Sequence, residues 1–98
     1  MTIYEIDGNK IKDIDSFVLE MNVSFFSKIE GANWRGNLNA FNDYLSWPTS
    51  KYKIIIRNSE NCKKALDIQY SSASDQTYWE AIMEIFLDNK QYVEVELV

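Results

Sequence analysis

A run of mostly β-branched residues near the middle of the chain, Tyr52-Lys53-Ile54-Ile55-Ile56-Arg57-Asn58, constrains the fold more than any other stretch. Its length and composition predict a strand, and its consecutive isoleucines predict a strand covered on both faces, as in a parallel sheet. Strands are also predicted at residues 2–6 and 93–97. The last of these alternates apolar residues with glutamates, which is typical of an edge strand whose glutamates face solvent.

Helical patterns fill the intervals between these strands. They predict four helices, at about residues 15–25, 37–46, 59–67 and 76–89. The candidate N-cap residues, in chain order, are Asp13, Asp15 or Ser16 for the first helix, Asn37 for the second, Ser59 for the third, and Ser74 or Asp75 for the fourth. Helical connections between successive strands favour parallel pairing, so the sequence predicts a single α/β domain over residues 1–98.

Composition narrows the class of protein. The chain of 98 residues carries 15 acidic and 10 basic side chains, for a net charge of −5, which argues against direct binding to nucleic acid. A basic protein is the more natural partner, although modest acidity can also simply aid solubility. No apolar run approaches the ~18 residues that span a membrane, the N-terminus lacks the pattern of a secretion signal, and Cys62 is the only cysteine. We therefore expect a cytoplasmic protein that does not bind membranes.

The residues that usually carry catalysis are scarce. The chain has no histidine, and a single cysteine cannot build a zinc site of the usual type. It contains no glycine-rich phosphate loop and no nucleophile elbow. We therefore expect a binding protein and not an enzyme, with no cofactor and no metal.

The stretch from Trp34 to Trp47 is the best candidate for a binding surface. In the predicted helix, one side carries Leu38, Phe41 and Leu45, and the opposite side carries Asn39, Asp43 and Ser46. Short polar side chains on a rigid helix lose little entropy when they dock into a pocket, although such faces are also common where a helix only meets water. Trp34, in the loop before the helix, could be either a lid over the core or a contact with a partner.

The segment Asn37-Leu38-Asn39-Ala40-Phe41-Asn42-Asp43-Tyr44-Leu45 resembles the N-L-D-A-L/F-x-D-x-L segment of the barstar family of ribonuclease inhibitors. The order of the predicted elements is also similar along essentially the whole chain, but only this segment is specific. The resemblance implies a three-stranded parallel sheet packed by about four helices. It also implies that the second helix and the preceding loop occlude the active site of a cognate ribonuclease.

Several residues take their expected roles from this resemblance. The family's central acidic residue corresponds to Asp43, its earlier helix aspartate to Asn39, its loop aromatic to Trp34, and its acidic residue on the last helix to Asp88. The residues expected to contact the partner are Trp34, Arg35, Gly36, Asn37, Asn39, Asn42, Asp43, Ser46, Trp47 and Asp88.

Two departures from the family pattern suggest an unusual target. Asn39 replaces a carboxylate, and Arg35 places a positive charge in a loop expected to face a basic enzyme. We therefore expect an immunity protein, monomeric and bound 1:1 to a dedicated toxin, such as the nuclease tip of a contact-delivered or secreted bacterial toxin.

Two other functions stay open at this point. One is a non-inhibitory interaction domain on the same fold that docks through Trp34 and Trp47. The other is a metal-dependent enzyme built on the acidic stripe of the last helix, Glu80, Glu84 and Asp88, although such stripes most often only solvate a helix.

Overall fold

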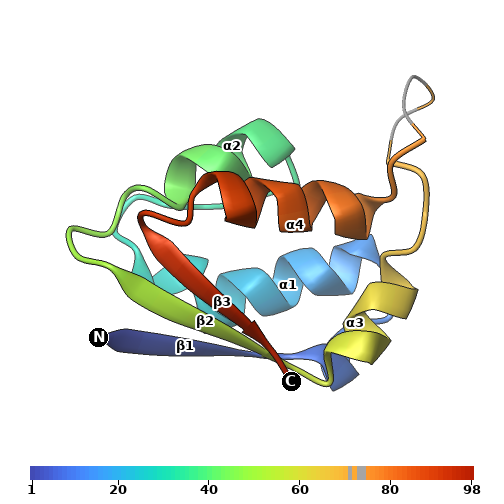
Figure 1. Ribbon diagram of the computed structural model, residues 1–98, viewed down its shortest axis with the longest axis horizontal. Coiled ribbons are helices and arrows are strands. Elements are labelled where there is room, and N and C mark those ends of the chain that lie inside the picture. Colours follow the sequence, from blue (N-terminus) through green and yellow to red (C-terminus); the bar gives the residue numbers. More distant parts are fainter. Residues whose placement is uncertain (71, 73–74) are drawn as a thin grey trace.

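The computed structural model describes residues 1–70, 72 and 75–98. Figure 1 shows a small sheet with helices packed above it and one helix at its end. Within the described residues the elements are β1 (Thr2–Asp7), the 3-10 turn η1 (Gly8–Lys10), α1 (Ile14–Ser24), the 3-10 turn η2 (Phe26–Lys28), α2 (Leu38–Tyr44), β2 (Tyr52–Arg57), α3 (Ser59–Ala65), α4 (Tyr78–Asp88) and β3 (Val93–Leu97).

The sheet has the strand order β1-β2-β3, and both pairings are parallel. Tyr4 pairs with Ile54, and Ile54 pairs with Val95, so the three strands run side by side in a simple order. The predicted α/β fold, with a three-stranded parallel sheet and four α-helices in the described residues, is confirmed. The isoleucine-rich strand is central, as its composition predicts.

The described residues cover only one face of this sheet, so the prediction that both faces of β2 are buried is wrong. Ile54 and Ile56 point into the core and are fully buried, whereas Ile55 is only partly buried. The reason is that α1, α2 and α4 all lie on the same face, with α3 at the edge where the strands end (Figure 1).

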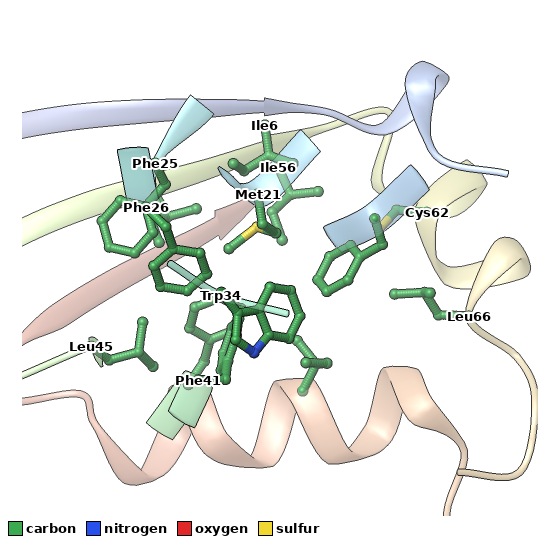
Figure 2. Close-up of a cluster of buried hydrophobic side chains, with 14 of the residues drawn as sticks. Ile6, Met21, Phe25, Phe26, Trp34, Phe41, Leu45, Ile56, Cys62 and Leu66 are labelled. Atoms are coloured by element: carbon green, nitrogen blue, oxygen red, sulfur yellow. The ribbon is translucent and has the colours of Figure 1, made fainter. Parts of the chain in front are cut away.

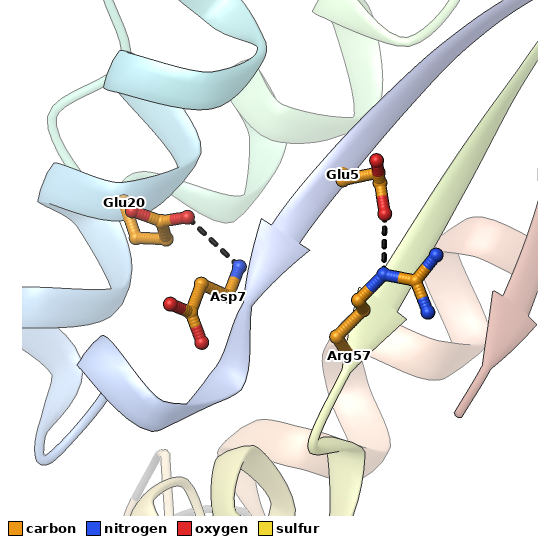
Figure 3. A network of polar contacts seen from close by, with 4 residues as sticks. All are labelled: Glu5, Asp7, Glu20 and Arg57. Atoms are coloured by element: carbon orange, nitrogen blue, oxygen red, sulfur yellow. Dashed lines mark hydrogen bonds and ion pairs between the residues drawn. The ribbon is translucent and has the colours of Figure 1, made fainter.

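Charged side chains occupy the uncovered face. Lys53 Nζ lies 2.8 Å from Glu96 Oε1, and Arg57 forms an ion pair with Glu5 across β2 and β1 (Figure 3). Each pair is offset by two residues from the register of its strands, and an offset of two keeps both side chains on the same face, so each pair joins neighbouring strands on the solvent side. The expectation that the β3 glutamates face solvent agrees with the exposure of Glu94 and Glu96.

Aromatic rings dominate the core between the sheet and the helices. The Trp34 ring packs against those of Phe17, Phe26 and Phe41, at centroid distances of 5.8, 5.5 and 5.0 Å. Figure 2 shows this cluster between the sheet and α4, with Cys62 and Leu66 at its edge. Burial raises the pKa of the Cys62 thiol to about 12, so the thiol stays protonated and inert at neutral pH.

Caps fix the starts of α1 and α4. Asp13 accepts a hydrogen bond from the Ser16 N–H, which lowers the pKa of Asp13, and Ser16 Oγ accepts from the Asp13 N–H in return. At α4 the same reciprocal box joins Thr77 and Glu80, and the hydrogen bond from the Thr77 N–H lowers the pKa of Glu80.

Two predicted caps are corrected. The N-cap of α4 is Thr77 and not Asp75, because the Thr77 hydroxyl accepts from the Glu80 N–H; Ser74 lies outside the described residues. The N-cap position of α3 is Asn58 and not Ser59. Asn58 adopts a left-handed conformation with φ 53°, which asparagine tolerates, and turns the chain directly from β2 into α3.

A buried carboxylate on α1 connects this helix to the end of β1 by a hydrogen bond. Glu20 is 5% exposed, and its Oε2 accepts a hydrogen bond from the Asp7 N–H at 2.8 Å (Figure 3). The same oxygen accepts from Ser24 Oγ, also at 2.8 Å. The next residue, Gly8, passes so close to the backbone of Arg57 and Asn58 that a Cβ atom would overlap their carbonyl oxygens. Glycine is therefore required here by close backbone approach.

Candidate functional site

The site is built on α2, a short helix that is fixed at both ends. Asn37 is its N-cap, and the Asn37 side-chain oxygen accepts from the backbone N–H groups of Asn39 and Ala40, at 2.8 and 3.2 Å. At the other end, the Leu45 carbonyl accepts a 2.7 Å hydrogen bond from the Tyr52 hydroxyl. The predicted helix start is confirmed, and the helix ends slightly earlier than predicted, at Tyr44.

Apolar residues hold the inner side of this segment. Phe41 and Leu45 are fully buried, and Leu38 is partly buried. Burial raises the pKa of Tyr52, so its hydroxyl remains a donor to the end of α2 over the physiological range. The segment is therefore tied to the core and to the central strand, and its outer side has a defined orientation.

The outer side presents small polar groups. Asn39, Asp43 and Ser46 are all exposed, as the helical periodicity predicts. Ser46 folds back, and its N–H and hydroxyl both donate to the Asp43 carbonyl. The two ion pairs in the described part of the chain do not involve Asp43, and no described residue donates a hydrogen bond to its carboxylate. Asp43 is thus a fixed but unpaired negative charge.

A groove of about 570 Å³ separates α2 from α4. Its α2 side includes Asn39 and Asn42, and its α4 side includes Glu84 and Asp88. An amide contact bridges the two helices, because Asn89 Nδ2 donates to Asn42 Oδ1 at 2.7 Å. The structure therefore brings Asp88 close to the α2 surface, and it uses the acceptor atom of Asn42 to hold the two helices together.

Trp34 is a core residue and not a surface contact. Its side chain is 1% exposed, and its Nε1 donates a 2.7 Å hydrogen bond to the Asn37 carbonyl at the start of α2. The expectation that Trp34 touches a partner is therefore corrected. Three packed aromatic rings and a hydrogen bond to the helix start make Trp34 a support for the site from beneath.

The loop before α2 places its other predicted residues differently. Arg35 and Asn37 are exposed, so both are accessible to a partner. Gly36 is half-buried, adopts φ +102°, and accepts a hydrogen bond from the Tyr78 hydroxyl on α4 at 3.3 Å. Its conformation favours glycine and turns the chain into the helix.

Trp47 marks the end of the site. Its side chain is 46% exposed, and its ring packs edge-on against Tyr44 with centroids 4.7 Å apart. The docking surface that would combine Trp34 with Trp47 does not form, because only Trp47 reaches solvent.

The acidic stripe of α4 does not assemble a metal site. No group of three metal-ligating side chains occurs among the described residues. Glu80 caps its own helix, and Glu84 Oε2 accepts from Gln76 Nε2 at 2.6 Å.

Among the described residues, the structure contains no helix with the length and apolar character needed to cross a membrane.

Two residues that line the groove were not among the predicted partner contacts. Glu84 lies one turn before Asp88, a spacing that places both on the same side of α4 and could have assigned it. Tyr70 also lines the groove, but it comes from the segment between α3 and α4, and no periodic pattern places it there.

A scan of the chain against models of known protein families and a search of curated protein sequences both returned no match. The resemblance to the barstar family therefore stays a prediction.

Proposed function

We propose that this protein is a ribonuclease inhibitor, the immunity protein of a bacterial toxin, and that it occludes the toxin's active site with α2 and the loop before it. The observation that carries the proposal is Asp43, an exposed carboxylate without a partner in the described chain, on a helix fixed at both ends. The resemblance of residues 37–45 to the barstar family supports the same assignment.

The chemistry of the target fits this surface. A ribonuclease gathers arginine and lysine side chains around the scissile phosphate, because negative charge develops there in the transition state. A carboxylate held on a rigid helix can satisfy those donors with charge-assisted hydrogen bonds. Asp43 supplies the central charge on α2, outside the groove, and Glu84 and Asp88 on the α4 side of the groove add further acidic groups.

Two exposed residues define how the target differs from a uniformly basic active site. Asn39 contributes a neutral amide one turn before Asp43, where it can donate as well as accept hydrogen bonds. Arg35 adds a positive charge that requires an acidic or polar position on the toxin. The proposed partner is therefore a dedicated toxin, bound 1:1 in the cytoplasm, whose acidic spot meets Arg35.

The test is an RNA-cleavage assay with the nuclease encoded next to this protein's gene. Wild-type protein should abolish cleavage at a 1:1 ratio, and Asp43→Ala should require a large excess. Asp67→Ala is the matched control, because it removes an exposed carboxylate near the end of α3, away from α2. Full inhibition by Asp43→Ala at a 1:1 ratio would contradict the role of Asp43, and no inhibition by the wild type would contradict the proposed function.

The second candidate is a non-inhibitory interaction domain, favoured by the exposed ring of Trp47 against Tyr44. Aromatic contacts of this kind bind with little dependence on salt, whereas an electrostatic inhibitor associates more slowly as salt rises. Trp47→Ala with Asp43→Ala separates the two functions. Loss of binding in the tryptophan variant alone, at any salt concentration, would favour the interaction domain.

A further inference from the structure

A second surface lies on the opposite side of α4 from the groove between α2 and α4. Here α4 and β3 enclose an apolar groove of about 640 Å³. Leu87 on the helix is 66% exposed and Leu97 on the strand is 48% exposed, so the groove carries a large exposed apolar side chain on each of its two walls. The apolar lining is Met83, Phe86, Leu87, Val93, Val95 and Leu97.

The outer edge of β3 borders this groove. β3 pairs with β2 alone, and it forms the rim of the sheet in Figure 1. The Val98 N–H donates to the Ile56 carbonyl, so the alternation of a parallel ladder turns the backbone groups of Val95 and Leu97 away from β2. No described residue bonds to these outward groups. An unpaired edge of this kind accepts an extended peptide as an additional strand.

Charge defines the chemistry of that peptide. Lys51 and Lys90 line the groove at the end where β3 begins, since Tyr52 and Val93 are in register. The two ion pairs of the described chain leave both lysines unpaired. Across the strand, on the uncovered face of the sheet, β3 carries Glu94 and Glu96; Glu96 is paired with Lys53, and Glu94 takes part in neither ion pair of the described residues. One end of the groove therefore attracts a carboxylate, and Glu94 on the uncovered face attracts a cation.

We propose that this groove binds an extended peptide of a partner protein, which pairs antiparallel with β3 as a fourth strand. Its alternate apolar side chains enter the groove beside Met83 and Leu87. A basic side chain between them lies beside Glu94, and the C-terminal carboxylate of the peptide meets Lys51 and Lys90.

A second copy of this chain is a poor occupant of the same edge. Antiparallel pairing of two β3 strands about Val95 would place Glu94 of one copy opposite Glu96 of the other. Like charges directly opposite each other destabilise a strand pair. The surface is also separate from Asp43, so the proposal does not depend on the inhibitor function, and the two partners could bind together.

The experiment uses the full chain and a fluorescent peptide of about seven residues, alternating valine and lysine with a free C-terminal carboxylate. Binding is followed by anisotropy, and the site is mapped by backbone amide chemical shifts. We expect saturable binding with shifts at β3 and α4. Leu87→Glu should weaken binding by about tenfold or more. Leu19→Glu, a change at a 65% exposed leucine on α1, should not weaken it.

A second pair of probes leaves the protein unchanged. N-methylation of the peptide amides that face β3 should abolish binding, and methylation of the alternate amides should preserve it. Equal effects of the two methylated peptides, equal effects of the two leucine variants, or no binding at millimolar peptide would each overturn the proposal. Self-association lost in Leu87→Glu would assign the edge to a second copy, and saturable decanoate binding without peptide binding would assign the groove to an acyl chain.

Discussion

The N-cap of α2 should control the stability of the proposed inhibitor surface. In Asn37→Ala, the backbone N–H groups of Asn39 and Ala40 lose their side-chain acceptor, while the Asn37 carbonyl keeps its bonds from Trp34 Nε1 and the Phe41 N–H. The variant therefore isolates the cap. Loss of an N-cap of this kind costs about 1 kcal/mol of unfolding free energy, which corresponds to a fall in Tm of about 4–8 °C for a domain of this size.

A series at this position makes the prediction specific. Asn37→Asp should match or exceed wild-type stability, because α2 has no acidic residue in its first turn to favour the helix dipole. Asn37→Ser should fall close to wild type. Asn39→Ala is the matched control, since the Asn39 side chain is exposed and only its backbone N–H takes part in the cap.

Urea denaturation measures all four variants under one condition. We expect a lower urea midpoint for Asn37→Ala and no loss for Asn39→Ala. Equal midpoints for these two alanine variants would refute the reasoning, because they would show that the cap contributes nothing measurable to α2.

Two further predictions concern the close backbone approach at Gly8 and the capping boxes of α1 and α4. Gly8→Ala should lower the unfolding free energy by about 2 kcal/mol, since its Cβ would overlap the carbonyl oxygens of Arg57 and Asn58; an unchanged urea midpoint would contradict this. Hydrogen bonds from backbone N–H groups lower the pKa values of Asp13 and Glu80 in the folded protein. These carboxylates therefore stabilise the fold at pH values above their ordinary pKa of about 4. This stabilisation is lost as the pH falls through the lowered pKa values of the folded state. An Asp13→Asn, Glu80→Gln double variant should therefore show a flatter loss of stability below about pH 4 than wild type, and parallel curves would contradict it.

Local patterns predicted the order of the elements and the central strand. They failed where the outcome depends on how the helices pack against the sheet. Ile55 follows the same sequence pattern as its neighbours, yet it faces the uncovered side, because the intervening helices pack on one face only. Local chemistry did contain the correct cap of α4, since Thr77 and Glu80 have the spacing of a capping box.

In the candidate site, too, local patterns predicted some features, and others depend on packing between distant elements. Helical periodicity correctly separated Asn39 and Asp43 from the buried Phe41. The burial of Trp34 could not be read from its loop, because the rings that cover it come from α1, η2 and α2. The groove beside α2 also needs α4, whose approach to α2 follows from packing and not from either helix alone.

Calorimetric binding of the cognate nuclease tests the central claim most directly. Wild type and the Asp43→Ala and Asp67→Ala variants are compared at one low salt concentration. We expect Asp43→Ala to lose more than ~2 kcal/mol of binding free energy, about 30-fold in Kd, and Asp67→Ala to bind as wild type does. Equal affinities for all three proteins would contradict an inhibitor that acts through the Asp43 carboxylate.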